Sequence, residues 1–420
     1  MNCWEKLFGK RRNIDLWRIA VTISFVASIL RSGVFADGGS LPVWYALQFG
    51  PILVAIFVSL LSPAPRLRRV DRLIMVSMGA VVAASALSAV SSANRQDTLA
   101  QAGILGLMFG FFAVTFWRRW TARSVIRGDL LLVFILICTV QLVGLACGLF
   151  QLPFAFSYFG RFTGLMSNAN YAGMLACLAL PLAVYIYRSF NRWIAVTGAA
   201  LSIVALLMSG SRGALVAAGL GLLALVFFLP IRQRIITLGT LVLAIILGLL
   251  VAGPLVMSTI GQTFTRESQN TDITSGRGVI YAQMVEAWLR NPWTGYGYHE
   301  TDFVTAGLSG HNTYLSTLTE TGAIGFLAFL ALMFGVIAAG PWRTADRFVL
   351  GVVVSVAVVE ATESAIFGWG GPTALVSWVM LLGFAALGRD EGPAVPGLTE
   401  VNSRQTRSFN EDGKARPAEA

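Results

Sequence analysis

Runs of about 20 apolar residues follow one another along most of this chain, and their length limits the folds open to it. A helix rises about 1.5 Å per residue, so a run of about 17 to 25 apolar residues crosses the hydrocarbon core of a bilayer. Twelve such runs are predicted as membrane-spanning helices: residues 16–35, 41–61, 73–90, 99–117, 130–150, 171–187, 193–208, 214–229, 235–257, 312–339, 348–367 and 373–387. The sequence therefore predicts an all-α polytopic transmembrane bundle of about 12 helices.

The composition excludes a soluble protein. Only 12% of the residues are charged and 56% are hydrophobic, whereas a soluble domain carries about 25% charged residues. A soluble core of this length has too little interior to bury that much apolar surface. The four cysteines give no disulfide framework: Cys3, Cys138, Cys147 and Cys177.

The positive charge is arranged by topology. The net charge is +10, but the basic residues form short clusters in alternate loops and make no continuous basic face, so no nucleic-acid partner is expected. By the positive-inside rule these loops and both termini face the cytoplasm of a bacterial inner membrane. The clusters are Arg66, Arg68, Arg69 and Arg72; Arg118, Arg119, Arg123 and Arg127; Arg188 and Arg192; Arg232 and Arg234; and Arg343 and Arg347.

The ends of the chain complete the domain prediction. Lys6, Lys10, Arg11 and Arg12 precede the first apolar run as in a signal peptide, but no clear cleavage site follows, so a retained first helix is expected. Residues 1–388 are predicted as one transmembrane unit, within which residues 258–311 form a structured periplasmic loop. Residues 389–420 are predicted as a disordered cytoplasmic tail.

Two polar segments on the outer side precede helices. In the first, Asn168 and Asn170 are suited to cap a helix, or to bind an anion there together with Arg161. In the second, Ser211 and Arg212 stand in a Gly-rich turn that opens a helix, where free N–H groups and a guanidinium suit a phosphate. The competing interpretation is that this arginine only extends to the membrane interface.

The periplasmic loop adds a second arginine and an imidazole. Arg277 is predicted at the start of a helix that Asn291 and Pro292 end, a position that suits a diphosphate. On local grounds a simple exposed loop arginine is an alternative of equal weight. His311 lies at the outer end of the tenth span, and a histidine suits proton transfer from a sugar hydroxyl near neutral pH, although a lone histidine is more often structural.

Polar side chains also enter the last spans. Asn312, Ser316 and Glu320 recur at every fourth residue and share one helix face. Glu360 and Glu363 are predicted on one face in the outer half of the next helix. Carboxylates in lipid are costly and face a polar partner or cavity, so these two are expected either to pair with an arginine or to support the site.

Together these segments resemble the O-antigen ligase and polymerase family of bacterial membrane glycosyltransferases, best between residues 161 and 329. The resemblance rests on RFTGLMSNANYAG at 161–173, SRG at 211–213, GR, W and NPWTGYG between 276 and 297, and HNTYL and ETGAIG between 311 and 325. Any one of these motifs alone would be weak, and the first five spans add little.

The resemblance implies a GT-C-like fold and a donor glycan carried on undecaprenyl diphosphate at the periplasmic face. Arg212 and Arg277 match arginines thought to hold the diphosphate, and His311 matches the proposed general base. The anomeric carbon would be transferred to an acceptor hydroxyl with inversion, without a metal or other cofactor, because the arginines stabilise the departing diphosphate.

The resemblance leaves the acceptor open. A ligase transfers polysaccharide to lipid A–core and is slightly favoured; the alternative is an O-antigen or exopolysaccharide polymerase that joins lipid-linked repeat units. The loop from Arg277 to His311 is short for the family, so acceptor contacts are expected to differ. A secondary transporter is a more distant alternative. Transporters bind their substrate at the membrane midplane between repeats, whereas the polar candidates here gather at the outer face and no internal repeat is apparent.

Overall fold

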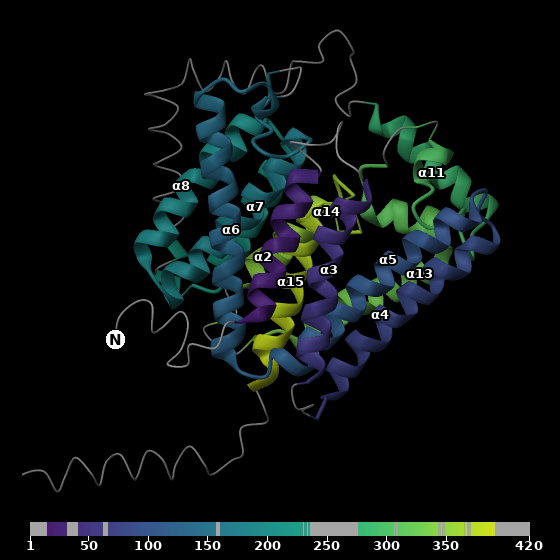
Figure 1. Ribbon diagram of the computed structural model, residues 1–420, viewed down its shortest axis with the longest axis horizontal. Helices are drawn as coiled ribbons and strands as arrows, with labels where there is room; N and C mark the ends of the chain where they lie inside the picture. The colour runs from purple at the N-terminus through teal and green to yellow at the C-terminus, as the bar shows by residue number, and fades with distance from the viewer. Residues whose placement is uncertain are drawn as a thin grey trace, which may run out of the picture.

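The protein is a helical bundle, drawn in Figure 1 from a computed structural model. The structure describes residues 15–31, 41–61, 66–156, 160–229, 231–232, 234–235, 276–305, 307, 310–342, 346, 349–364, 366–367 and 371–390. Over these residues it contains no β-strand, only an isolated bridge between Phe156 and Phe162. The predicted all-α class is therefore confirmed.

The helices have the following bounds. The α-helices are α2 Leu16–Ile29, α3 Leu41–Leu60, α4 Arg69–Leu87, α5 Arg95–Val114, α6 Arg123–Leu149, α7 Ala169–Ser189, α8 Arg192–Ser209, α9 Arg212–Val226, α11 Arg277–Arg290, α12 Thr301–Val304, α13 Thr313–Ala339, α14 Leu350–Glu360 and α15 Pro372–Leu387. Short tighter or wider turns occur at η2 Ser88–Val90, η3 Thr115–Arg119, η4 Pro153–Ala155 and η6 Gly388–Asp390.

The predicted spans coincide with these helices. Within the described part of the chain, seven helices are long and apolar enough to cross a membrane, and α2, α9, α14 and α15 are shorter apolar helices. Each of them falls on a predicted span. Apart from residue 235, the predicted span 235–257 lies outside the described residues, as do the basic N-terminal segment, residues 258–275 of the predicted periplasmic loop and the tail from residue 391.

Three boundaries differ from the prediction. The helix expected over 348–367 ends at Glu360, and the one expected over 312–339 is interrupted at Gly322, whose φ is 66°. Arg389, expected to begin a disordered tail, instead belongs to the folded bundle. Its guanidinium contacts Asp71 at 3.3 Å and donates to the carbonyl of Trp120.

Asparagine side chains begin the helices that later form the site. The Oδ1 atoms of Asn168, Asn191 and Asn312 accept hydrogen bonds from backbone N–H groups in the first turns of α7, α8 and α13. Such a cap satisfies a donor that has no partner inside the helix. Asn94 caps α5 in the same way. Each cap fixes the residue at which its helix starts, and therefore which residues lie at each end of that helix.

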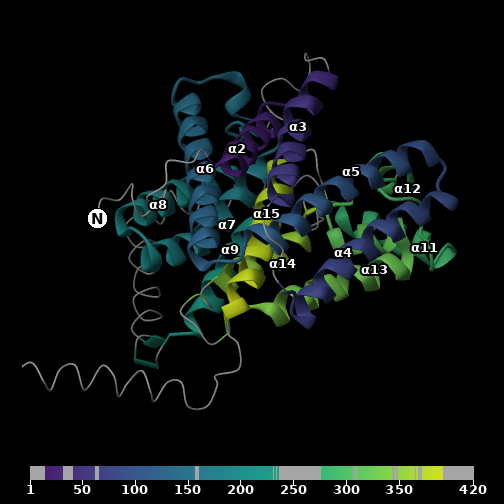
Figure 2. The same cartoon turned by 60° about the horizontal axis from the view of Figure 1, so that its bottom comes forward.

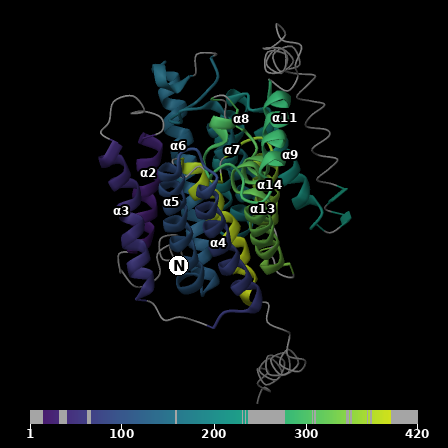
Figure 3. The ribbon, with the colours of Figure 1, turned by 90° about the vertical axis from the view of Figure 1, so that its right-hand side faces the viewer.

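Helix α7 lies at the centre of the bundle. In its apolar window 83% of the residues are buried, against 22% for α3. Figures 1 and 2 show α6, α7 and α8 on one side, α4, α5 and α13 on the other, and α14 and α15 between them. Figure 3 shows α2 to α6 and α13 running in roughly the same direction, with α11 near one end of the bundle.

The two ends of the bundle differ in chemistry. At one end, buried ion pairs join the predicted basic loops to neighbouring helices: Asp129 accepts from Arg18 and Arg119 at 2.8 and 2.9 Å, and Arg127 donates to Asp346 at 2.8 Å. The opposite end contains the starts of α7, α9 and α13 and the end of α14. Because these helices alternate in direction, the polar residues singled out in the sequence gather at that second end.

Candidate functional site

Glu363 is the centre of the site. It follows α14, with its backbone N–H donating to the Val359 carbonyl at 2.9 Å, and it is 3% exposed. Its Oε1 atom accepts from Asn170 at 2.7 Å and from Arg277 at 2.9 Å, and its Oε2 atom lies 2.8 Å from Nδ1 of His311. One carboxylate thus links α7, α11 and the start of α13.

This position corrects the prediction that Glu363 lies on a helix face beside Glu360. The helix ends at Glu360, and the following backbone turns Glu363 toward three partners. Glu360 makes different contacts: its Oε2 atom accepts from the hydroxyl of Thr313 and from the N–H of Ile366. A broken helix is tolerated at membrane depth where protein or a polar cavity surrounds it.

Arg161 extends the network across α7 and α8. Its guanidinium donates to the Ser209 carbonyl at 2.8 Å and to Oδ1 of Asn170 at 2.6 Å. Asn170 in turn donates a hydrogen bond to Glu363, so its amide group connects Arg161 to the Glu363 carboxylate. Asn168 caps α7 through the N–H of Asn170, as the capping interpretation predicted.

Arg277 is the first residue of α11 and keeps donors for an anion. Its guanidinium donates to the Thr362 carbonyl at 2.6 Å and to Glu363 at 2.9 Å. An arginine has five N–H donors in a planar fork, so these two bonds leave three. The pairing with Glu363 is the ion pair that the sequence offered as one explanation for a carboxylate in a membrane helix.

Arg212 begins α9, and the start of this helix packs against Thr362. Its neighbour Gly213 packs so closely that a Cβ atom there would lie 2.2 Å from Oγ1 of Thr362. This close approach brings the start of α9 to the same turn that binds Arg277. Ser211 is only 2% exposed and packs against Gly173 of α7, so it positions the turn rather than facing solvent.

His311 is held from three sides. Its φ of 45° is unusual for a residue other than glycine, and such strain persists only where the surroundings fix it. The hydroxyl of Tyr281 donates to its carbonyl at 3.1 Å, and the N–H of Asn312 donates to Oγ of Ser364 at 2.9 Å. The imidazole, 30% exposed, pairs through Nδ1 with Glu363.

The interruption of α13 explains much of the NPWTGYG and ETGAIG motifs. At Gly322 the helix loses its own hydrogen bonds, and residues 291–297 replace them. The N–H of Tyr296 donates to the Thr319 carbonyl at 2.9 Å, and that of Gly297 to the Glu320 carbonyl at 3.0 Å. In return the N–H of Ala323 donates to the Pro292 carbonyl at 2.8 Å. These motif residues therefore dock the loop onto the helix.

Glu320 lies in a cavity next to this break. Its carboxylate accepts a hydrogen bond from the hydroxyl of Thr301. The cavity has a volume of about 180 Å³, and Ser316 also lines it. Asn312, on the same predicted face, is connected indirectly, because Ser364 contacts both Ser316 and the N–H of Asn312.

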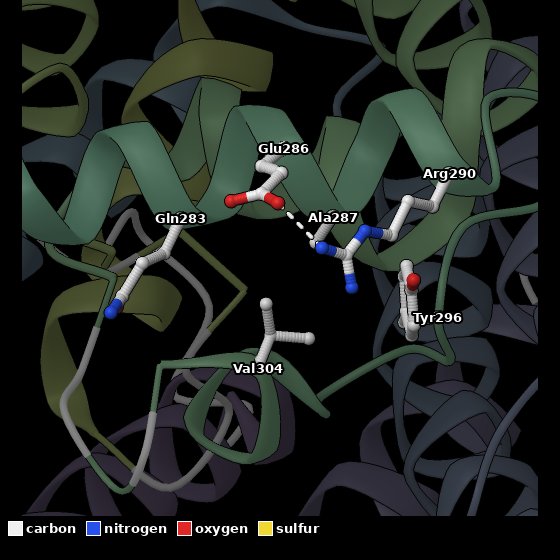
Figure 4. A pocket seen from close by; sticks show the side chains of 6 residues that line it. All are labelled: Gln283, Glu286, Ala287, Arg290, Tyr296 and Val304. Atoms are coloured by element: carbon white, nitrogen blue, oxygen red, sulfur yellow. Dashed lines mark hydrogen bonds and ion pairs between the residues drawn. The ribbon is translucent and has the colours of Figure 1, made fainter.

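A second cavity, of about 210 Å³, lies on the far side of α11. Figure 4 shows Gln283, Glu286 and Arg290 projecting from α11 toward Val304 and Tyr296. Glu286 and Arg290 pair with each other one helical turn apart, and both are well exposed. No residue of the Glu363 network lines this cavity.

The sequence prediction missed three residues that hold the site. Tyr281 follows Arg277 by four residues, so both lie on one face of α11, and this spacing was a usable signal. Thr362 and Ser364 flank Glu363 but take part through a carbonyl and a hydroxyl in a non-helical turn. No periodicity points to them, because the turn itself was predicted as helix.

The chain contains a recognisable family region. Residues 197–330 match the family model described as O-antigen ligase. No curated protein matches the chain. The matched region runs from α8 through most of α13, and it excludes Arg161, Asn170 and Glu363. The part of the chain that contains Arg212, Arg277 and His311 is therefore similar to the O-antigen ligase family.

Proposed function

We propose that this multi-pass membrane protein transfers a glycan from undecaprenyl diphosphate to a hydroxyl of lipid A–core at the periplasmic face of the inner membrane. The observation that carries the proposal is the single buried carboxylate, Glu363, that contacts both Arg277 and His311. A cation suited to bind phosphate and an imidazole suited to accept a proton both contact this one carboxylate, which supports the proposal. The family match supports glycan ligation or polymerisation as the class of reaction.

The cationic side suits the diphosphate of the donor. Arg277 has three remaining N–H donors, and Arg212 begins α9 beside the same turn. Guanidinium groups bind phosphate oxygens through paired N–H bonds, and the positive ends of α9 and α11 add to the attraction. As the bond to the leaving oxygen breaks, these groups stabilise the added negative charge.

His311 is placed to take the proton of the acceptor. A carboxylate only accepts hydrogen bonds, so Nδ1 of His311 donates to Glu363, and the lone pair of Nε2 stays available. Nε2 removes the hydroxyl proton while the acceptor oxygen bonds to the anomeric carbon. The bond from that carbon to the phosphate oxygen breaks, and its electron pair leaves with the diphosphate. Attack opposite the leaving group inverts the anomeric carbon.

The orientation follows from the charged loops. The basic clusters lie at the end of the bundle opposite Glu363, and basic loops stay in the cytoplasm. The site then faces the periplasm, as a lipid-linked donor displayed on the outer leaflet requires. The same orientation puts both termini in the cytoplasm.

The cellular test removes the gene and separates lipopolysaccharide on a gel. Loss of polymer from lipid A–core, with full-length polymer accumulating on undecaprenyl diphosphate, is the expected result. Single repeat units on lipid A–core would instead identify a polymerase, the alternative that the family match leaves open. Unchanged patterns would contradict both.

The role given to the arginines adds a second test. If Arg212 and Arg277 supply the positive charge at the diphosphate, transfer by the purified protein proceeds at an unchanged rate in excess EDTA. A rate that falls with EDTA and returns with a divalent cation would contradict this part of the mechanism.

A further inference from the structure

The cavity that contains Glu320 has the features of a small sugar site. Aromatic side chains, Tyr171, Tyr298 and Phe367, line it together with the hydroxyls of Thr313, Ser316 and Ser364. Pockets of this kind combine apolar walls with a few polar groups that fix the orientation of a ligand. Drug-sized ligands need about 300–1,000 Å³, so a cavity of about 180 Å³ suits one sugar ring.

The cavity lies directly beside the proposed base. Gly310 and Thr313 line it and bracket His311 and Asn312 in the chain. Ser364, which also lines it, follows Glu363 and accepts from the N–H of Asn312 at 2.9 Å. A group held in the cavity therefore lies next to the His311–Glu363 pair.

The charge of the cavity is opposite to that of the donor side. Asp302 and His299 are exposed at its mouth, and Glu320 lies deeper. Two carboxyl groups, those of Asp302 and Glu320, thus line this cavity, whereas Arg277 contacts Glu363 and Arg161 is connected to it through Asn170.

From this juxtaposition we propose that the cavity binds the acceptor sugar, and that its carboxylates select a neutral or amino sugar over one that carries a carboxylate or phosphate. This inference rests on the proposed transfer function. Asp302 and Glu320 accept hydrogen bonds from sugar hydroxyls, the aromatic rings contact the C–H faces, and one hydroxyl reaches His311. An anionic sugar meets like charge and is rejected.

The separation of charge also keeps the two substrates apart. The diphosphate is attracted to the arginines and repelled by Asp302 and Glu320, so the donor has one favoured orientation. A neutral acceptor sugar is not attracted to the arginines in this way. Selectivity for the acceptor is then measurable without changing any residue that binds the diphosphate.

The test measures binding without the donor. The purified full-length protein in nanodiscs is mixed with a neutral methyl hexoside or with the methyl uronoside in which a carboxylate replaces its CH₂OH group. Saturation-transfer NMR reports which probe binds. We expect the uronoside to bind about tenfold more weakly or worse, the range that like-charge repulsion of about 1.4 kcal/mol or more produces.

Three variants make the test specific. Asp302→Asn, at the exposed mouth, narrows the preference for the neutral probe several-fold, and Glu320→Gln weakens binding of both probes. Glu286→Gln serves as the matched control, because its carboxylate lies on the same periplasmic segment but lines the other cavity (Figure 4). It leaves the preference unchanged.

The outcomes separate this inference from the proposed function. Equal binding of the two probes, or a preference that Asp302→Asn and Glu320→Gln leave intact, overturns the assignment of the cavity even if glycan transfer is observed. Selective binding that Glu320→Gln weakens supports a sugar site. If the same protein transfers no glycan from a supplied donor, the proposed function falls and the cavity is not an acceptor site.

Discussion

Glu363 contacts the two residues to which the proposed reaction gives opposite roles, Arg277 and His311. A buried carboxylate is costly in a membrane protein and is retained where charged partners meet it. Here the Oε1 atom contacts Arg277 and the Oε2 atom contacts His311, while Asn170 is a neutral donor to Oε1. Removing its charge would disturb the proposed diphosphate site and the proposed base together, whereas replacing Arg277 or His311 would disturb only one of them.

Replacement of Glu363 tests this coupling. We expect Glu363→Gln to reduce transfer about 10- to 100-fold, the cost of losing a partner that orients a functional histidine or ligand. Both the kcat and the KM for the donor change, because Arg277 and His311 lose their common anchor. Steady-state kinetics on reconstituted protein measures the two constants.

Glu363→Asp is the matched variant, since it keeps the charge and shortens the side chain. It should recover part of the lost activity. Full activity in Glu363→Gln, at wild-type protein levels, would show that the carboxylate is only a structural ion pair.

The proposed role of Arg277 in binding the diphosphate depends on its planar fork. Lysine keeps the positive charge but presents it as a point and cannot bond a carbonyl, a carboxylate and a phosphate at fixed angles. Arg277→Lys should therefore lose most of the activity of the wild type, with a raised KM for the donor. Arg290→Lys, on the exposed end of the same helix, is the control and should behave as wild type. An Arg277→Lys protein with an unchanged donor KM would argue against diphosphate binding by this side chain.

Residue identity was partly predictable. Position in the outer loops pointed to Arg212, Arg277 and His311, and the structure places them around one turn. The three contacts of Glu363 were not predictable, because helical periodicity placed this residue on a regular helix face beside Glu360. The end of α14 depends on tertiary contacts of the following turn, such as the Ser364 hydroxyl with Asn312, which a single sequence does not reveal.

At the scale of elements, the break in α13 and the loop 291–297 form one unit. A kink frees backbone groups that must find partners in a membrane protein. The loop supplies them, and Gly295 and Gly322 allow the contact. A Cβ atom at Gly295 would lie 2.4 Å from the Glu320 carbonyl oxygen, and one at Gly322 would lie 2.3 Å from that of Trp293. Both glycines also have positive φ.

Alanine substitution tests this unit. We expect Gly295→Ala and Gly322→Ala each to lower the thermal unfolding temperature, because the backbone strain alone costs about 1–3 kcal/mol and the overlap adds to it. Transfer falls as well, since Glu320 and the start of α13 shift. Unfolding in detergent, followed by loss of soluble protein with temperature, measures the first effect.

Gly103→Ala in α5 is the control. A Cβ atom there has open space, so helix propensity predicts equal or slightly higher stability. If Gly295→Ala and Gly322→Ala melt like the control variant, the close docking of loop and helix is wrong.

At the scale of the whole molecule, charge separates the two ends of the bundle. Arginines of the first two basic clusters form ion pairs with Asp71, Asp129 and Asp346 at one end. The Glu363 network occupies the other. Apolar run length and loop charge predicted this arrangement, because both depend on the bilayer rather than on detailed packing.

Labelling of single cysteines tests the orientation. In a background with the native cysteines replaced by alanine, Arg290→Cys should react with a membrane-impermeant maleimide in cells with a permeabilised outer membrane. Arg66→Cys should react only after the inner membrane is opened. Both positions are exposed, so access depends on the side of the membrane. The reverse pattern would place the site in the cytoplasm and contradict the proposed donor.

The central claim is that the turn around Glu363 transfers a glycan from a lipid diphosphate. The most direct measurement supplies purified protein in vesicles with an undecaprenyl-diphosphate-linked glycan and lipid A–core, and follows the product on a gel. The wild type and Glu286→Gln are predicted to form glycosylated lipid A–core, and His311→Ala and Arg277→Ala, at equal protein levels, to form none. Product from both of these variants at the wild-type rate would contradict the claim.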